Sequence, residues 1–336
     1  MKRVFSLGMA FAMAFCILFS GCAAESAEPS GEAVVGIAWC EDTDSEFFVN
    51  ICRAVEAAGG SWVMLDEVRS PSLSYDADGR LSGGVDDTGV LGADAAASVR
   101  SDTWHGSNAA EAVGDLRLVI FTGGADISPS LYAVPEEWHG IEAERDYCAE
   151  RDVSDYLTMA YCLDNDIPVV GFCRGMQMLS VVSGAEMIQD IPTRFAELSV
   201  PYHFEHRNEV ASPDDYRDYA SHSVQVETDS VLYDMVGTED LTGCPSWHHQ
   251  AVKSVENTPL RVTGFTDTDG ISIIEAVERT DKTFAVGMQF HPEAAVVKHL
   301  DGAANREDFM SYDAAISIFE RLIREAAEQT DTRSAA

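Results

Sequence analysis

Basic residues are scarce in this 336-residue chain, which has 22 lysines and arginines against 57 acidic residues. The net charge of −35 at pH 7 argues against binding to a nucleic-acid backbone, which requires a basic patch. It also argues against electrostatic docking on an anionic membrane. We therefore expect a strongly solvated acidic surface and no nucleic-acid partner, and the charge carries no information about a substrate.

The chain also lacks paired cysteine motifs, because its eight cysteines are widely spaced and form no Cys-x-x-Cys pair. This spacing favours neither a zinc site nor a dense disulfide framework. Two of the eight, Cys16 and Cys22, lie in the N-terminal segment. We expect most of the others to be buried apolar thiols, although an exported protein could still pair some of them.

No apolar run is long enough for a comfortable transmembrane helix, which needs about 20 residues. The N-terminal run, residues 4–19, follows Lys2 and Arg3 and ends at small residues directly before Cys22. This pattern resembles the signal peptide and lipobox of a bacterial lipoprotein.

That resemblance implies cleavage of residues 1–21 and lipid attachment to Cys22. The protein would then be extracytoplasmic and lipid-anchored to the bacterial cell membrane. The alternative is an ordinary cleaved signal peptide in which Cys22 has no role. Residues 22–33 are small and polar, and we expect them to form a tether.

Apolar runs of strand length alternate with helical patterns along the rest of the chain. Strands are expected at residues 34–39, 62–65, 116–121, 167–172, 223–227, 261–265, 271–277 and 284–289. Helices are expected at residues 47–58, 151–163, from 176 to 183, and 312–327. This alternation predicts an α/β fold with a mostly parallel central sheet and helices on both faces.

We expect this fold to form one domain over residues 34–325, followed by a polar tail at 326–336. Residues 69–108 break the pattern, because they are rich in Gly, Ser, Asp and Ala and show no sustained period. We predict a long loop insertion there.

The segment Gly171-Phe172-Cys173-Arg174-Gly175 follows a predicted strand and precedes a predicted helix. Its Gly-x-Cys-x-Gly spacing is the cysteine counterpart of the nucleophile elbow, a tight strand-to-helix turn. The glycines avoid Cβ clashes, and the helix N-terminus favours a thiolate. The backbone N–H of Arg174 is then placed to stabilise an oxyanion. We predict that Cys173 is a nucleophile rather than a core thiol beside a turn.

A candidate general base lies in Gln289-Phe290-His291-Pro292-Glu293, which follows another predicted strand. His291 would deprotonate Cys173 and later protonate the leaving amine. Glu293 would hydrogen-bond the other imidazole nitrogen and fix its tautomer. Taken alone, a histidine at a strand end is more often idle, and the elbow gives His291 its role.

These motifs resemble the class I glutamine amidotransferase-like superfamily and, more narrowly, the γ-glutamyl-γ-aminobutyrate hydrolase family. The segments that carry the resemblance are 168–177, 289–293, 123–127 with Pro129 and Tyr132, Arg151-Asp152, Gln189-Asp190 and 246–250. The resemblance implies a three-layer, flavodoxin-like fold and a Cys173–His291–Glu293 triad. It also implies an oxyanion hole from the backbone of Gly124 and Arg174.

The resemblance further implies γ-glutamyl amide substrates, a γ-glutamyl thioester on Cys173 and release of glutamate, without a metal or organic cofactor. His248, His249 and Gln250 are candidate substrate contacts, and each histidine is nearly as well explained as a hydrogen-bonded surface residue. Asp126 is a candidate for orienting the oxyanion loop, or only a cap.

The sequence departs from the family pattern at three positions. Ala125 stands where a third glycine is usual, Pro245 where an asparagine is usual, and Asp155 where a glutamate is common. The first two changes bear on the substrate more than on the catalytic residues.

Two other functions are compatible with the same fold. One is a glutaminase-type amidotransferase subunit, which normally needs a synthetase partner. The other is a catalytically silent binding lipoprotein, which would need none of the three triad residues. The sequence leaves the oligomeric state open, a homodimer included.

Overall fold

The computed structural model describes residues 33–139, 142, 145–209, 217–268 and 270–334 of the chain. The expected signal peptide and the expected tether up to residue 32 lie outside the described residues. Within the described ranges, no helix has both the length and the apolar character needed to span a membrane.

One sheet of eleven strands runs through the described part of the chain, with a parallel and an antiparallel side. The parallel side has the order β2 (Ser61–Met64), β1 (Val34–Ile37), β3 (Val119–Phe121), β4 (Val169–Phe172) and β11 (Ala285–Met288). The antiparallel side continues with β10 (Ile271–Arg279), β9 (Leu260–Thr268), β6 (Ala220–Val226) and β7 (Asp240–Ser246). Two further strands pair with each other beside β10, namely β8 (Ala251–Ser254) and β5 (Glu186–Ile188).

The register of the central parallel strands determines which loops meet. Val169 of β4 pairs with Val119 of β3 on one side and with Ala285 of β11 on the other. These strands therefore end at the same edge of the sheet, and the segments that follow them lie side by side. Those segments are residues 122–126, Cys173 and 289–293.

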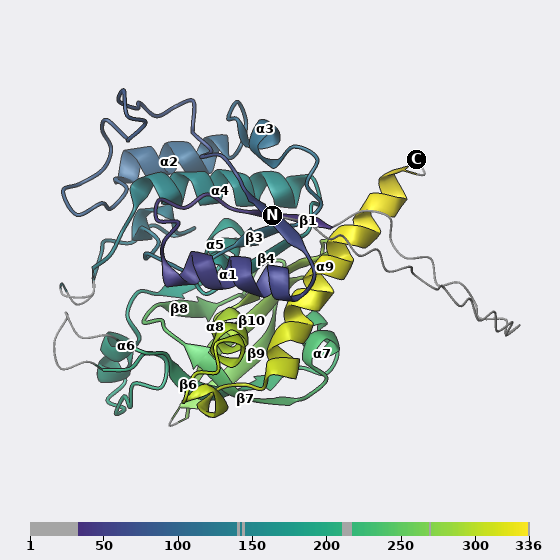
Figure 1. Ribbon diagram of the computed structural model, residues 1–336. Helices are drawn as coiled ribbons and strands as arrows, with labels where there is room; N and C mark the ends of the chain where they lie inside the picture. Colours follow the sequence, from purple (N-terminus) through teal and green to yellow (C-terminus); the bar gives the residue numbers. More distant parts are fainter. Residues whose placement is uncertain (1–32, 140–141, 143–144, 210–216, 269, 335–336) are drawn as a thin grey trace, which may run out of the picture. The chain divides into compact units, whose positions relative to one another are not determined.

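Helices cover both faces of the sheet and give it the three-layer architecture that the sequence predicts (Figure 1). One face packs against α1 (Glu46–Ala57), α7 (Val231–Val236), α8 (Pro292–Leu300) and α9 (Tyr312–Ser334). The other packs against α2 (Ala93–Asp102), α3 (Ala109–Val113), α4 (Ala149–Asp164) and α5 (Arg174–Val182). The remaining helix, α6 (Ile191–Glu197), packs Ile191 and Phe195 on Ala251 and Ile273. The predicted fold class is confirmed.

The loop predicted for residues 69–108 is wrong in part, because residues 93–102 form α2. Ala95, Ala96 and Val99 of this helix are buried in the same core as α4, and Figure 1 shows α2 alongside α4. These small side chains give the helix too little amphipathic contrast to stand out as a periodic pattern. The chain before α2 forms turns closed by isolated bridges between Tyr75 and Leu81 and between Val85 and Leu91.

The closing helix is longer than predicted. We expected it to end at residue 327 and to be followed by a polar tail, but α9 continues to Ser334. Its apolar positions Ile318, Phe319 and Leu322 are buried against the sheet. Phe319 lies over Phe172, with ring centroids 5.5 Å apart, so this helix supports the strand that carries the candidate nucleophile.

Candidate active site

Cys173 lies at the junction between β4 and α5, in the backbone conformation that the elbow predicts. Its φ of 49° and ψ of −105° are strained for a residue with a Cβ. Its N–H donates to the carbonyl of Met288 at 2.7 Å, which fixes the turn to β11. A Cβ on Gly171 would lie 2.2 Å from the carbonyl carbon of Gly175, so the turn has no room for a larger residue.

His291 and Glu293 form a fully buried pair at the start of α8. His291 Nδ1 lies 2.6 Å from Glu293 Oε1, so the Nδ1–H donates to the carboxylate and Nε2 is left for another partner. Burial favours the neutral imidazole, but the negative charges of Glu293 and Cys173 outweigh it and raise the pKa of His291 to about 10. The structure therefore brings the three predicted triad residues together, with His291 as an imidazolium between two acidic groups.

Aromatic rings hold the imidazole in place. The rings of Phe47 and Tyr219 each have their centroid 5.2 Å from that of His291. A Cβ on Gly123 would lie 2.9 Å from His291 Cε1, so the loop after β3 also closes on the ring. These contacts limit rotation of the imidazole and exclude water from it.

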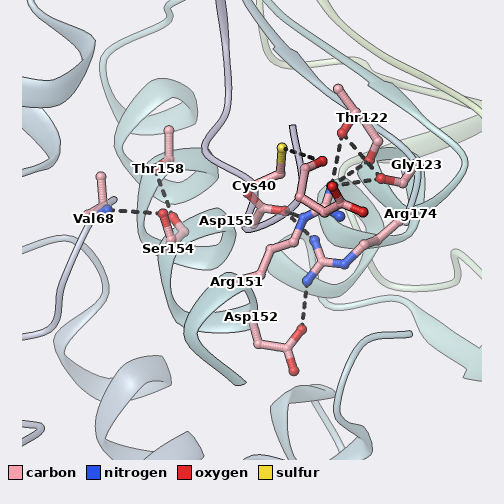
Figure 2. Close-up of polar contacts among 11 residues, drawn as sticks. Cys40, Val68, Thr122, Gly123, Arg151, Asp152, Ser154, Asp155, Thr158 and Arg174 are labelled. Atoms are coloured by element: carbon pink, nitrogen blue, oxygen red, sulfur yellow. Dashed lines mark hydrogen bonds and ion pairs between the residues drawn. The ribbon is translucent and has the colours of Figure 1, made fainter. Parts of the chain in front are cut away.

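The loop after β3 passes beside the nucleophile and is held by Arg151 of α4 (Figure 2). The Arg151 guanidinium donates to the carbonyl of Gly123 at 2.7 Å and to Thr122 Oγ1 at 2.9 Å. Gly124 has φ of 137°, and a Cβ there would lie 2.0 Å from Arg151 Nη1. The glycine at this position is therefore required by both its conformation and its neighbour.

The side chain of Arg174 points into the protein rather than into the cavity. It donates to Asp152 Oδ1 at 2.7 Å and to the carboxylate of Asp155, and all three side chains are buried (Figure 2). Burial raises the pKa of Asp152 to about 6, although Arg174 opposes the shift. These contacts tie the first turn of α5 to α4. They leave the Arg174 backbone N–H among the unpaired donors at the helix start.

Cys173 borders a cavity of about 350 Å³. The lining includes the predicted residues Gly124, Asp126, His248, His249 and Gln250. It also includes charged residues for which the sequence analysis found no motif, namely Glu41, Asp42, Asp146 and Arg207. The cavity therefore presents both signs of charge within reach of the nucleophile. These four residues lie in loops, where no periodic pattern marks them.

The three candidate substrate contacts have different surroundings. His249 places Nδ1 3.0 Å from Asp190 Oδ1 and Nε2 3.0 Å from Asp126 Oδ2, so both nitrogens donate. It thereby joins two motifs, Asp126 and Gln189-Asp190. His248 has its Nδ1 2.8 Å from the carbonyl of Gln250, and its Nε2 is directed toward a buried carboxylate.

We expect His249 to make stability depend on pH. Burial opposes its charge, but the two carboxylates outweigh burial and raise its pKa from 6.5 to about 9. A raised folded-state pKa gives stability that is fully present below pH 6.5 and is lost as pH rises through about 9. The free energy of unfolding, measured with urea from pH 6 to 10, should therefore fall more steeply for the native chain than for His249→Gln. Equal slopes for the two chains would contradict the imidazolium.

The other cysteines in the described residues are free thiols without a partner for catalysis. Cys40, Cys52, Cys162 and Cys244 are buried, as predicted, and Cys148 is half-buried. Burial raises the pKa of Cys52 to about 12 and that of Cys40 to about 11, which makes both thiols inert at neutral pH.

The fold and the elbow are those of the class I glutamine amidotransferase-like superfamily, as the sequence resemblance predicted. Residues 94–293 match the model of the Peptidase C26 family, and the chain belongs to that family. A Thermoplasma acidophilum protein assigned to GMP synthase has a solved structure of the same fold. It has a TM-score of 0.50 and 12% sequence identity, over 90% of this chain and 98% of that one.

Two curated relatives are similar over about half of this chain. Protein NtpR of Enterococcus hirae is 33% identical over 176 residues, which are 52% of this chain and 66% of NtpR. The γ-glutamyl-γ-aminobutyrate hydrolase PuuD of Escherichia coli K12 is 30% identical over 169 residues, which are 50% of this chain and 60% of PuuD. Each match thus spans less than two thirds of the relative's own length.

Proposed function

We propose that the chain is a cysteine-dependent hydrolase of γ-glutamyl amide bonds in small molecules or peptides. Membership of the Peptidase C26 family indicates a hydrolase. The observation that carries the finer proposal is the buried Glu293–His291 pair beside a strained Cys173, at one end of a charged cavity. The similarity to a γ-glutamyl-γ-aminobutyrate hydrolase supports the choice of bond.

In the first step, the Cys173 thiolate attacks the side-chain carbonyl of the γ-glutamyl group. The carbon–nitrogen bond breaks as His291 transfers its proton to the departing amine, and a γ-glutamyl thioester remains on the sulfur. In the second step, neutral His291 takes a proton from water, and the hydroxide attacks the thioester. Glutamate leaves, and the proton on His291 restores the ion pair with Cys173.

The charges in the cavity match the ends of a γ-glutamyl group, which carries an α-carboxylate and an α-ammonium. Arg207 would pair with the carboxylate, because a guanidinium binds carboxylates through two parallel hydrogen bonds. Glu41 and Asp146 would pair with the ammonium. In this arrangement, His249 and Gln250 shape the wall next to the bond that is cleaved.

The test is glutamate release by the purified chain from a panel of γ-glutamyl amines and peptides. Their α-glutamyl isomers serve as matched controls, because they have the same composition with the carbonyl misplaced relative to both charges. We expect release from the γ-linked compounds only. Release of ammonia from glutamine alone would instead support the glutaminase alternative. A folded chain that releases nothing from any member of the panel would contradict the proposal.

We propose that the backbone N–H groups of Gly124 and Arg174 form the oxyanion hole. Replacing Gly124 with alanine should lower kcat by about 100-fold, because the loop must move away from the Arg151 guanidinium. Gly59→Ala is the matched control, since Gly59 also has a positive φ but has open space around it. If Gly124→Ala left kcat at the level of Gly59→Ala, this loop would not form the hole.

We also propose that the chain works outside the cytoplasm, anchored by a lipid on Cys22. The support is the sequence pattern of residues 1–22, which lie outside the described residues. The Cys22→Ala variant should move from the membrane fraction to the soluble fraction of cells, while Cys148→Ala should remain in the membrane fraction. An unchanged distribution of the Cys22 variant would contradict the anchor.

A further inference from the structure

Three histidines and a glutamate converge in a buried cluster that the proposed reaction does not use. His206 lies in the chain before β6, His222 in β6, His248 after β7, and Glu275 in β10. One possible ligand atom from each residue lies within 4.8 Å of the others. The four side chains are at most 4% exposed.

The separations in this cluster match those around a tetrahedral metal ion. The Oε1 atom of Glu275 lies 3.2 Å from His206 Nδ1, 3.7 Å from His222 Nε2 and 3.6 Å from His248 Nε2. Zinc bonds of about 2.0–2.1 Å at tetrahedral angles place neighbouring ligand atoms about 3.3 Å apart. A central ion would therefore require only small side-chain movements.

The hydrogen-bond partners of two histidines leave their lone pairs facing the carboxylate. His248 Nδ1 lies 2.8 Å from the carbonyl of Gln250, and His222 Nδ1 lies 3.4 Å from that of Ser223. A carbonyl only accepts, so each Nδ1 carries the proton and each Nε2 is an acceptor. In the described part of the chain, both Nε2 atoms and both Glu275 oxygens lack a hydrogen-bond partner.

A buried group of acceptors around a carboxylate requires a positive charge. An isolated carboxylate is very costly to remove from water, and an imidazolium in its place would be costly to bury as well. Among the ion pairs of the described residues, Glu275 contacts only these histidines and no lysine or arginine. A divalent cation would satisfy all four side chains at once.

We propose that His206, His222, His248 and Glu275 bind a divalent transition-metal ion, with zinc as the best match. Imidazole nitrogens with one carboxylate oxygen are ligands that zinc accepts, and four protein ligands leave no open position for substrate. The site is therefore structural. This inference departs from the expectation of no metal that the family resemblance implied, and it stands whether or not the substrate is a γ-glutamyl amide.

The ion would fix the wall of the cavity from behind. Besides the ligand His248, the same segment carries Trp247, whose carbonyl lies 3.8 Å from Cys173 Sγ. Ser246 donates from Oγ to the carbonyl of His206 at 2.9 Å, so two ligand-bearing segments are already joined there. The ion would link them to β6 and β10. His248 thus serves as a ligand rather than as the substrate contact considered from the sequence.

The test is the metal content of the full chain, purified from cells grown with added zinc and measured by mass spectrometry of the elements. We expect about one zinc ion per chain, as for a closed four-ligand site. His222→Phe and Glu275→Gln should lower the content to background, whereas His222→Cys should retain the ion because a thiolate is also a zinc ligand. His105→Ala is the control, since that histidine is exposed and outside the cluster.

A second measurement does not depend on the folding of any variant. Removing metal from the native chain with a chelator should lower its melting temperature, and added Zn²⁺ should restore it. Co²⁺ in the emptied site should give the strong visible absorption of a tetrahedral complex. A native chain with background metal content, and with a melting temperature insensitive to the chelator and to Zn²⁺, would show a hydrogen-bonded histidine cluster and overturn the proposal.

Discussion

Replacing Cys173 with alanine is expected to abolish glutamate release from γ-glutamyl compounds, with a fall in kcat/KM of about 10⁴-fold or more. The size follows from the structure, because no other described thiol borders the cavity beside His291 except Cys40, whose pKa burial raises to about 11. Without the sulfur, the chain would have to activate water directly at a site built to hold a thiolate against an imidazolium. Initial rates of glutamate release, normalised to folded protein, measure the loss.

Two comparisons separate loss of the nucleophile from loss of the fold. Cys148→Ala removes a half-buried thiol outside the cavity lining and should retain the native rate. Acid quenching of the native chain during turnover should trap a mass increase equal to one glutamyl group, absent in Cys173→Ala. Native turnover by a correctly folded Cys173→Ala chain would rule out the thioester mechanism.

The elbow and the catalytic base could be predicted because their physics is local. Gly171 and Gly175 are required by clashes within one turn, and Glu293 lies two residues from His291, so short motifs contain the information. The flanking strands were predictable for a similar reason, since β4 and β11 are continuous apolar runs that are buried on both faces.

The cavity walls and the histidine cluster depend instead on how distant segments are brought together. His206, His222, His248 and Glu275 come from the antiparallel side of the sheet, and their sequence spacing matches no metal motif. Only the pairing of β6, β9 and β10 places them around one point. Arg207 and Asp146 likewise reach the cavity from loops whose path depends on tertiary packing.

Arg174 shows how a motif residue can have a role that its position does not reveal. The elbow motif assigns a function to its backbone N–H, but nothing in the spacing indicates where the side chain points. The structure places the guanidinium between Asp152 and Asp155 of α4, with all three groups buried. The Asp155 that replaces a common family glutamate is thus one of its two partners.

Replacing Arg174 with methionine is therefore expected to destabilise the protein by about 3–5 kcal/mol, because two buried carboxylates lose their cation. Methionine fills much of the same volume, so the loss reflects charge rather than a cavity. The free energy of unfolding from urea titration at pH 7 measures the effect. The matched control is Arg53→Met, which breaks an equally bidentate pair with Asp301 on the surface, where side chains are 37% and 54% exposed. That change should cost about 1 kcal/mol or less.

A second variant distinguishes unpaired charge from any other damage at this position. In the triple substitution Arg174→Met, Asp152→Asn and Asp155→Asn, no buried carboxylate is left without a cation, so much of the lost stability should return. Asp152 also accepts from the Ser128 N–H at 2.9 Å, and the asparagine oxygen can keep that bond. If the triple variant were no more stable than Arg174→Met alone, the cost would lie in packing of α5 on α4. The guanidinium would then act as a spacer rather than as a counter-ion.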